Sequence, residues 1–185
     1  MGDHFWEGKK IRLRAIESCD WELFHQNDYD SEAARLSDVI YPPRSSEAAQ
    51  KWAEKQSERE VEDHEMMLAI ETLDEELVGT IAAFNCNRTS GFFYYGLAIF
   101  RDHWRKGYAT EAISIFLKYF FEECRYQKVN AFVYEFNEAS IHLHKKLGFK
   151  CEGRLRRTYF TKGQYFDEFI FGLTVEEFYE KIFDQ

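Results

Sequence analysis

An apolar strand that leads through a basic, glycine-bearing turn into a long amphipathic helix is the feature that most constrains this chain. The apolar segment is Phe92–Phe100, and the turn contains Arg105, Lys106 and Gly107. Beyond the turn the apolar residues recur with the spacing of one helix face, at Ala109, Ala112, Ile113, Phe116, Leu117, Phe120 and Cys124. This spacing predicts an amphipathic helix that begins at the turn. The segment therefore predicts a strand, a turn and a helix in immediate succession.

The start of that helix is suited to bind an anion. The first N–H groups of a helix have no partner inside it and lie at the positive end of its dipole. Gly107 and Ala109 leave room for a ligand, while Arg105 and Lys106, with Arg101 before them, add positive charge. The chain has neither the G-x-x-x-x-G-K-S/T pattern of nucleoside triphosphate sites nor the G-x-G-x-x-G pattern of dinucleotide sites. A diphosphate of another kind is therefore the expected ligand.

The composition predicts one folded domain over residues 1–185. The chain is 45% hydrophobic and long enough to bury a full core. Its cysteines lack a C-x-x-C pair, so we expect reduced core residues of a cytoplasmic protein and neither a disulfide framework nor a zinc site. They are Cys19, Cys86, Cys124 and Cys151. Met1–Lys10 has no apolar run long enough for a signal peptide, and no later segment approaches a membrane span.

The charge balance argues against some kinds of binding partner and favours others. A formal net charge of -9 argues against general nucleic-acid binding, which requires a basic face. It suits a small cationic substrate, although an acidic surplus also serves solubility. Aromatic residues make up 18% of the chain, so some of them could line a substrate cleft or a subunit interface. The composition leaves open whether the chain forms a homo-oligomer.

The remaining pattern orders the other elements. Further strands are predicted at Lys9–Ile16, Met66–Thr72, Leu77–Asn85, Val129–Phe136, Arg154–Phe160 and Tyr165–Leu173. Further helices are predicted after the cap Ser18, from about Ser46 through an acidic tail at Glu58–Glu65, from the cap Asn137 to Gly148, and after the capping box Thr174–Glu177. The last two strands form a hairpin over Thr161–Gln164. This order predicts an α+β fold with a mixed, largely antiparallel sheet of about seven strands and helices on both faces.

Two segments resemble motifs of the GCN5-related N-acetyltransferase (GNAT) family. Trp104–Ala112 resembles the acetyl-CoA pyrophosphate motif Q/R-x-x-G-x-G/A, and Asn137–Phe149 resembles the motif N-x-x-S/A-x-x-x-Y-x-K-x-G-F. The resemblance covers nearly the whole chain in element order. Cys151–Arg154 and Lys162–Tyr165 are also similar to the bacterial branch that acetylates ribosomal-protein N-termini and polyamines.

The resemblance implies a three-layer fold whose sheet splays between Phe92–Phe100 and Val129–Phe136, with acetyl-CoA in the gap. It implies that one backbone segment pairs with the pantetheine arm, that the turn holds the pyrophosphate, and that the second motif reaches the pantetheine and the nucleotide end. The implied cofactor-binding residues are Leu97, Ala98, Ile99, Trp104, Arg105, Lys106, Gly107, Tyr108, Ala109, Thr110, Asn137, Ser140 and Lys146, with Lys145 as an alternative to the last. Trp104 replaces the Gln or Arg of the motif, so one side-chain contact is expected to be missing.

His144 is the catalytic residue that the resemblance implies. It stands where many family members carry a tyrosine that protonates the departing thiolate. A neutral imidazole can still donate a hydrogen bond from its N–H to sulfur, and a positioned donor contributes about 10²- to 10⁴-fold. The alternative is that His144 occupies an outward-facing position on its helix and has no catalytic role.

The sequence does not identify the general base that would deprotonate the amine. Glu135 lies beside the splayed strand, but its alternation directs it away from the side expected to meet substrate. Tyr94, Tyr95 and Tyr134 could instead line a wet channel that relays a proton, or could be core aromatics. Glu111 is best explained as a carboxylate that favours the positive end of its helix.

The leading hypothesis is an acetyl-CoA-dependent N-acetyltransferase in which an amine attacks the thioester directly in a ternary complex. A polyamine, a peptide N-terminus and an aminoglycoside remain possible acceptors. The alternative is a CoA-binding regulatory or interaction domain without catalysis, because Trp104 and His144 both depart from the family pattern. The histidines lack the i, i+4 pairing of a metal site, so no metal, nucleic acid or membrane partner is expected.

Overall fold

A computed structural model of the chain describes residues 4–183. The elements are β1 Ile11–Arg14, the 3-10 helix η1 Ser18–Asp20, α1 Trp21–Asn27, α2 Ser31–Ser37, α3 Ser46–Ser57, β2 Met66–Thr72, β3 Leu77–Asn87, β4 Phe92–Ile99, the 3-10 helix η2 Arg101–His103, α4 Tyr108–Glu122, β5 Lys128–Tyr134, α5 Glu138–Lys146, β6 Lys150–Thr161, β7 Gln164–Thr174 and α6 Val175–Phe183. Seven strands form a sheet in the order β1-β2-β3-β4-β5-β7-β6. β4 and β5 run parallel, whereas the β1–β2, β2–β3, β5–β7 and β6–β7 pairs are antiparallel. The predicted α+β fold with a mixed, largely antiparallel sheet is therefore confirmed.

The chain divides into two compact units. Among the described residues, the N-terminal unit contains 4–83 and 97–116, and the C-terminal unit contains 84–96 and 117–183. β3, β4 and α4 contribute residues to both units. The single domain over residues 1–185 stays a prediction. In the part of the chain that the structure describes, no helix has the length and the apolar content required to span a membrane.

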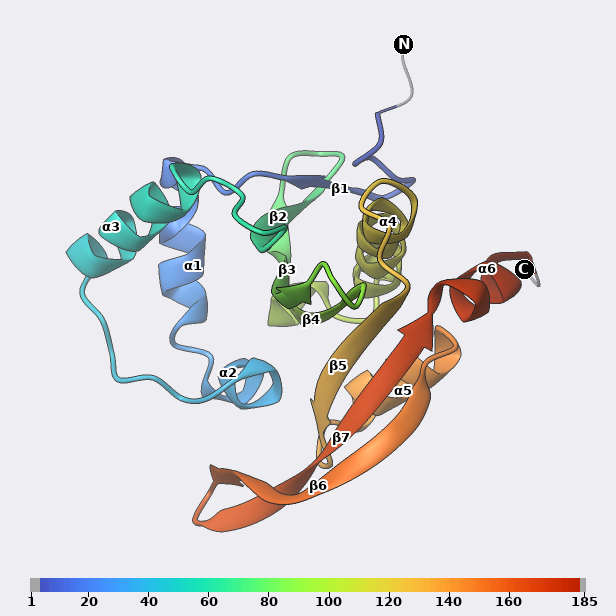
Figure 1. Cartoon of the computed structure of the whole chain (residues 1–185). Helices are drawn as coiled ribbons and strands as arrows, with labels where there is room; N and C mark the ends of the chain where they lie inside the picture. The colour runs from blue at the N-terminus through green and yellow to red at the C-terminus, as the bar shows by residue number, and fades with distance from the viewer. Residues whose placement is uncertain (1–3, 184–185) are drawn as a thin grey trace. The chain divides into compact units, whose positions relative to one another are not determined.

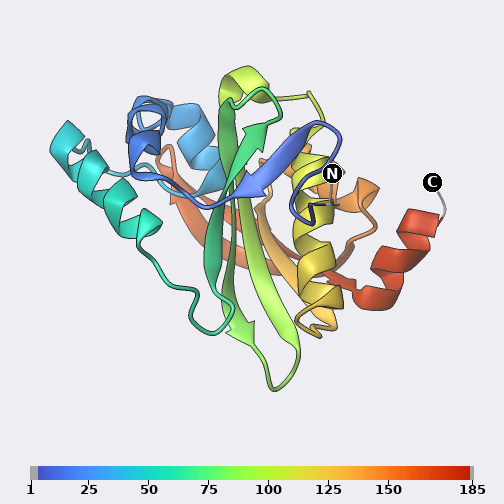
Figure 2. The same cartoon turned by 90° about the horizontal axis from the view of Figure 1, so that it is seen from above.

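The N-terminal unit has an apolar core to which strands and helices both contribute. Ile16, Phe24, Ala69 and Leu77 form a buried cluster, and Trp52, Met67 and Phe100 pack against it. The rings of Phe24 and Trp52 meet edge to face with their centroids 5.0 Å apart. Ala49 and Ala53 of α3 are fully buried, and their spacing of four residues places them on one face of the helix. Figure 1 and Figure 2 both show α1 and α3 side by side.

A buried carboxylate joins β2 to the two arginines of β1. Glu71 is 5% exposed and accepts hydrogen bonds from Nε of Arg12 at 2.5 Å and from Nε of Arg14 at 2.6 Å. Arg14 also donates to both carboxylate oxygens of Asp20, at 2.8 and 2.9 Å. The bonds to Asp20 and Glu71 raise the pKa of the Arg14 guanidinium, so this cation stays charged. The network holds β1 in register with β2, where Arg12 lies opposite Glu71.

Glu71→Gln should lower the free energy of unfolding by about 2 kcal/mol, because two arginines would lose a charged partner that is shielded from water. Chemical denaturation at neutral pH measures this change. Glu75→Gln is the matched control, since the exposed Glu75 carboxylate lies 3.5 Å from the same Arg12. Its effect should stay below about 0.5 kcal/mol. Equal effects of the two substitutions would contradict the importance of the buried network.

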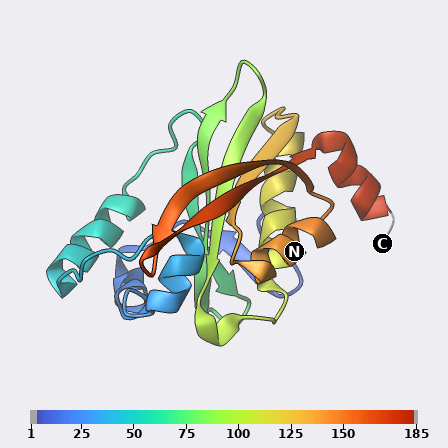
Figure 3. The ribbon, with the colours of Figure 1, turned by 90° about the horizontal axis from the view of Figure 1, so that it is seen from below.

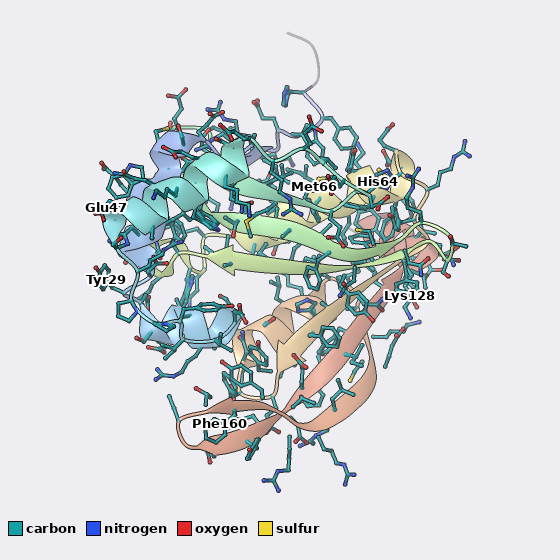
Figure 4. All side chains as sticks on the ribbon, turned by 60° about the vertical axis from the view of Figure 1, so that its left-hand side comes forward. Tyr29, Glu47, His64, Met66, Lys128 and Phe160 are labelled. Atoms are coloured by element: carbon teal, nitrogen blue, oxygen red, sulfur yellow. The ribbon has the colours of Figure 1, made fainter. Side chains whose placement is uncertain are left out.

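The C-terminal unit is built on a long hairpin of β6 and β7. Its turn is Lys162 and Gly163, whose φ angles of 51° and 76° suit a two-residue hairpin turn. The curved hairpin is prominent in Figure 1 and Figure 3, and Figure 4 labels Phe160 near its turn. Thr174 then caps α6, since its N–H donates to Glu177 at 3.0 Å and its hydroxyl accepts from the N–H of Glu177 at 3.4 Å. The predicted hairpin and capping box are both confirmed.

The strands of the C-terminal unit have two different faces. One face, here called the packed face, carries Phe93, Tyr95, Val129, Ala131, Phe171 and Leu173, all buried. Phe93 stacks on Phe120 of α4 at 4.1 Å between ring centroids, and Phe171 stacks on His144 of α5 at 5.4 Å. The opposite face, here called the aromatic face, carries Phe92, Tyr94, Phe132 and Tyr134, because successive strand residues alternate. Both α4 and α5 therefore cover the packed face within this unit.

Several local predictions were wrong. Ser18 does not cap α1, which follows η1 and has Asp20 at its N-cap position. α3 ends at Ser57, so the acidic stretch Glu58–Glu65 lies outside the helix. α2 was missed, because its seven residues are too few to show a clear apolar face; its cap is the Asp30 carboxylate, which accepts from the N–H groups of Glu32 and Ala33.

The cysteines are free thiols, but the prediction that they lie in the core was wrong. Cys19 and Cys151 are exposed, and Cys86 and Cys124 are only partly buried. Burial still raises the pKa of the Cys124 thiol, which keeps it protonated and weakens it as a nucleophile.

Candidate active site

β4 and β5 part from each other within the C-terminal unit. Their parallel register runs from Phe92 opposite Lys128 to Tyr94 opposite Asn130 and ends there. β5 continues to Tyr134 with β7 on its other side, and β4 continues to Ile99. Tyr95 is therefore the first β4 residue beyond the paired stretch. A strand that leaves its partner presents backbone N–H and C=O groups that another extended chain can bind.

Tyr95 and His144 form a buried hydrogen-bonded couple in this unit. The Tyr95 hydroxyl lies 2.8 Å from Nε2 of His144. Nδ1 of His144 lies 2.7 Å from the carbonyl oxygen of Ser140. Because a carbonyl can only accept, Nδ1 carries the hydrogen, and Nε2 accepts from the Tyr95 hydroxyl. Each residue therefore holds the other in one orientation, and Ser140 selects one imidazole tautomer.

Both members of the couple are neutral. Burial lowers the pKa of His144, although the bond to Ser140 opposes the shift, and burial raises the pKa of Tyr95. The outward position considered for His144 was wrong, since the side chain is 6% exposed and its ring meets Phe149 edge to face at 4.9 Å. Its part in catalysis stays a prediction.

The free energy of unfolding should fall as the pH drops below about 6.5, in part because of His144. The unfolded chain binds a proton on this imidazole more readily than the folded chain, whose His144 has a lowered pKa. Stability therefore increases with pH through this window. Chemical denaturation at about pH 8 and about pH 5.5 should show a smaller fall in a His144→Phe variant. The same fall in both proteins would contradict a buried neutral His144.

The predicted pyrophosphate turn lies in the N-terminal unit. Arg105 and Gly107 have left-handed φ angles of 62° and 88°, which turn the chain sharply into α4. The Trp104 indole Nε1 donates to the carbonyl oxygen of Ile99 at 2.6 Å. Trp104 thus ties the turn to the end of β4, a structural role that the motif comparison did not suggest. This bond occupies one acceptor site of the Ile99 carbonyl, and the Ala98 carbonyl lies against Gly79 of β3.

Arg101 does not supply free positive charge to the turn, contrary to expectation. Its guanidinium binds the Asp30 carboxylate at 2.5 and 2.6 Å and Glu32 at 3.1 Å. The Arg101 bond lowers the pKa of Asp30 to about 2. The guanidinium also lies over the Trp104 ring, 5.1 Å from its centroid. Arg101 therefore connects the turn to the start of α2.

A cation that the sequence reasoning missed lies at the same turn. Nζ of Lys10 donates to the carbonyl oxygen of Lys106 at 3.0 Å. The same Nζ would be 3.2 Å from a Cβ atom placed on Gly107. The Glu111 carboxylate accepts from the backbone N–H of Lys10 at 3.1 Å and from that of Lys9. Glu111 therefore anchors the chain before β1, and no local sequence signal joins positions so far apart.

The second motif caps α5 as predicted. Oδ1 of Asn137 accepts from the N–H of Ser140 at 3.0 Å, and the Ser140 hydroxyl lies 3.3 Å from Nδ1 of His144. Lys145 and Lys146 are exposed at the end of the helix. Within the set of predicted cofactor residues, Leu97–Thr110 belong to the N-terminal unit, whereas Asn137, Ser140 and Lys146 belong to the C-terminal unit. Their binding roles stay predictions.

The residues considered as a base have other partners. Glu135 accepts from Nη2 of Arg154 at 3.0 Å and from the N–H of Asp167 at 2.8 Å, which makes it part of the hairpin structure. Tyr94 stacks on Phe132 at 5.1 Å between centroids, and Tyr134 stacks on Tyr159 at 4.0 Å. These rings line the aromatic face.

Known proteins are similar to this chain over most of its length. The family described as Acetyltransferase (GNAT) domain matches residues 10–150. The SPbeta prophage-derived uncharacterized N-acetyltransferase YokL of Bacillus subtilis (strain 168) is 44% identical over 178 residues, which cover 96% of this chain and 97% of the relative. The spermidine N(1)-acetyltransferase of Escherichia coli (strain K12) is 28% identical over 158 residues, covering 84% of this chain and 81% of the relative.

The fold is also similar to that of solved structures. The spermidine N-acetyltransferase from Vibrio cholerae, solved in complex with CoA and spermine, has a TM-score of 0.79 at 22% identity and covers 91% of this chain and 98% of its own. At this identity the structural similarity shows only a shared fold. The family match and the alignment with YokL show membership of a family. The chain therefore belongs to the GNAT family of acetyltransferases and is an N-acetyltransferase.

Proposed function

We propose that this N-acetyltransferase moves the acetyl group of acetyl-CoA to a primary amine by direct attack in a ternary complex. The acceptor is a small cationic amine such as a polyamine, or a peptide N-terminus. The observation that carries the proposal is the Tyr95–His144 couple, which lies where β4 leaves β5. Relatives named as spermidine N(1)-acetyltransferases support an amine acceptor.

Backbone groups and cations of the N-terminal unit would bind the cosubstrate. Leu97 and the N–H of Ile99 are proposed to pair with the pantetheine arm, since the Ala98 and Ile99 carbonyls already have neighbours. The turn Arg105–Thr110 would receive the pyrophosphate, with Lys10 and Lys106 as nearby cations. In the C-terminal unit, Asn137, Ser140 and Lys146 are the proposed contacts.

Direct attack needs no covalent intermediate on the protein. Acetyl-CoA supplies the acetyl group as a thioester. The ammonium group of the acceptor first loses a proton to water. The lone pair of the neutral amine then forms the new N–C bond, the C–S bond breaks, and the electron pair of that bond goes to sulfur. The amine nitrogen releases its proton to water.

The Tyr95–His144 couple is proposed to stabilise the departing thiolate. Nδ1–H of His144 is committed to Ser140, and Nε2 is an acceptor. The hydroxyl hydrogen of Tyr95, which donates to Nε2 in this structure, is therefore the one that would turn from Nε2 toward sulfur as negative charge develops there. This assignment moves the donor from the imidazole to the phenol. His144 then acts as the positioning residue that fixes the Tyr95 ring.

Incubation with acetyl-CoA, a thiol reagent and a panel of amines tests the proposed function. The panel contains spermidine, a peptide with a free N-terminus and an aminoglycoside. Thiol release that depends on an amine is the expected result. Binding of acetyl-CoA without thiol release on any amine would instead support a silent CoA-binding domain. The alternative without catalysis was considered because Trp104 and His144 depart from the family motifs. In the structure both side chains form hydrogen bonds, Trp104 with Ile99 and His144 with Tyr95.

A further inference from the structure

Glu168 is a carboxylate on the aromatic face of the C-terminal unit that is not among the proposed catalytic or cofactor-binding residues. Glu168 of β7 lies opposite Tyr134 of β5 on one side and opposite Leu155 of β6 on the other. Ile170 lies opposite Phe132 in the same register. Since strand neighbours opposite each other share a face, Glu168 stands on the aromatic face with Phe132 and Tyr134.

The charges around Glu168 set it apart from the acidic residues Glu135, Glu152 and Asp167 of the same unit. Glu152, on the same face, is paired with Lys128 at 2.7 Å, and Figure 4 labels Lys128 at the start of β5. Glu135 and Asp167 share Arg154. Within residues 4–183, Glu168 has no cationic partner, and its one side-chain hydrogen bond is to Thr158. A carboxylate placed in this way is ready to accept a cation from outside the chain.

The surroundings of Glu168 make a bound cation favourable. The side chain is partly buried, and burial raises its pKa despite the bond to Thr158. Such a carboxylate loses hydration without a compensating positive charge, so an ammonium group of a ligand would stabilise its ionised form. The neighbouring rings supply apolar contact, since Tyr94 stacks on Phe132 and Phe132 is 40% exposed. Methylene groups and ammonium groups in alternation match such a surface.

The position of Glu168 along the sheet suggests a length for the ligand. β4 and β5 part after Asn130, and Glu168 lies opposite Tyr134 further along β5. The two points are separated by about 13 Å at the rise of an extended strand. A single ammonium group cannot occupy both ends of that span. A linear amine with a second ammonium group can place one end at the parting and the other at Glu168.

We infer that Glu168 binds the distal ammonium group of a linear polyamine acceptor, while the aromatic face contacts the methylene segments. This inference rests on the proposed function and names the substrate class of that site. Glu168 is thereby a specificity residue, and it takes no part in the bond-forming step. Spermidine is the probe, and a monoamine such as butylamine is the comparison that lacks the distal charge.

The test compares spermidine with butylamine at saturating acetyl-CoA in wild type, Glu168→Gln and Glu152→Gln. Glu168→Gln should lower kcat/KM for spermidine about 20-fold, mainly through KM, and should leave kcat/KM for butylamine unchanged. Glu152→Gln should leave both substrates unchanged, since that carboxylate already has Lys128 as partner. An equal loss on both amines, or no loss on spermidine, would overturn the inference.

A second comparison needs no variant. In the wild-type protein, kcat/KM should increase from butylamine to putrescine to spermidine as the distal charge comes within reach of Glu168. A flat series would overturn the assignment of Glu168, while the turnover of butylamine would still support the proposed function. Absence of turnover on all three amines and on a peptide with a free N-terminus, with acetyl-CoA bound, would overturn the proposed function itself. The two failures are therefore distinguishable.

Discussion

Replacement of His144 by Phe should lower kcat about 10³-fold and leave the KM for acetyl-CoA nearly unchanged. The phenyl ring fits among Phe149 and Phe171, but it removes the acceptor that holds the Tyr95 hydroxyl. The Tyr95 ring and its hydroxyl oxygen would then lose the contact that fixes their position when charge develops on sulfur. Steady-state kinetics with saturating amine, over a range of pH, measures the effect.

The matched control is His142→Phe, because His142 lies on the same helix and is exposed. It should change kcat by less than about 2-fold, as expected for a surface position. Thermal unfolding of both variants separates a folding defect from a catalytic one. Unchanged turnover of His144→Phe at every pH would remove the Tyr95–His144 couple from the mechanism.

Replacement of Gly107 by Val should raise the KM for acetyl-CoA about 10²-fold and keep kcat at saturation within a few-fold. A β-branched residue rarely adopts the φ of 88° found here, and its Cβ would crowd Nζ of Lys10 at 3.2 Å. Both changes would disturb the N–H groups at the start of α4, where the pyrophosphate is proposed to bind. Direct binding of CoA by calorimetry measures the loss.

Gly163→Val provides the control for backbone strain. Gly163 has a φ of 76° at the hairpin turn, and a Cβ there would have no neighbour within 4 Å. This variant should lose a similar amount of conformational stability, about 1–2 kcal/mol, without weaker CoA binding. Intact CoA affinity in Gly107→Val, or an equal loss in Gly163→Val, would show that the turn is not the pyrophosphate site.

The elements that could be predicted from sequence are those with strong local signals. The apolar face beyond Gly107 marked α4, Asn137 marked the start of α5, and the pair Lys162 and Gly163 marked the hairpin turn. Each signal is complete within a few neighbouring residues, so no knowledge of the rest of the chain is needed. The order of the elements along the chain and the family resemblance followed from the same local patterns.

The missed features depend on residues that only the fold brings together. Lys10 meets Lys106 and Tyr95 meets His144 through contacts between distant positions, which periodicity cannot detect. His144 was hard to place for a further reason: a polar residue near the end of a helix is usually exposed, and here Tyr95 and Ser140 satisfy both ring nitrogens. Glu168 alternates like any strand residue, and only the register of β5, β6 and β7 shows that it lies opposite Tyr134 and Leu155 on the aromatic face.

A double-mutant cycle on kcat tests the Tyr95–His144 couple most directly. Tyr95→Phe, His144→Phe and the combined variant are compared with wild type at saturating acetyl-CoA and amine. If the two residues act as one unit, the double variant should be no slower than the slower single variant. Losses that multiply, so that the double variant is slower by the product of the two single effects, would contradict the account.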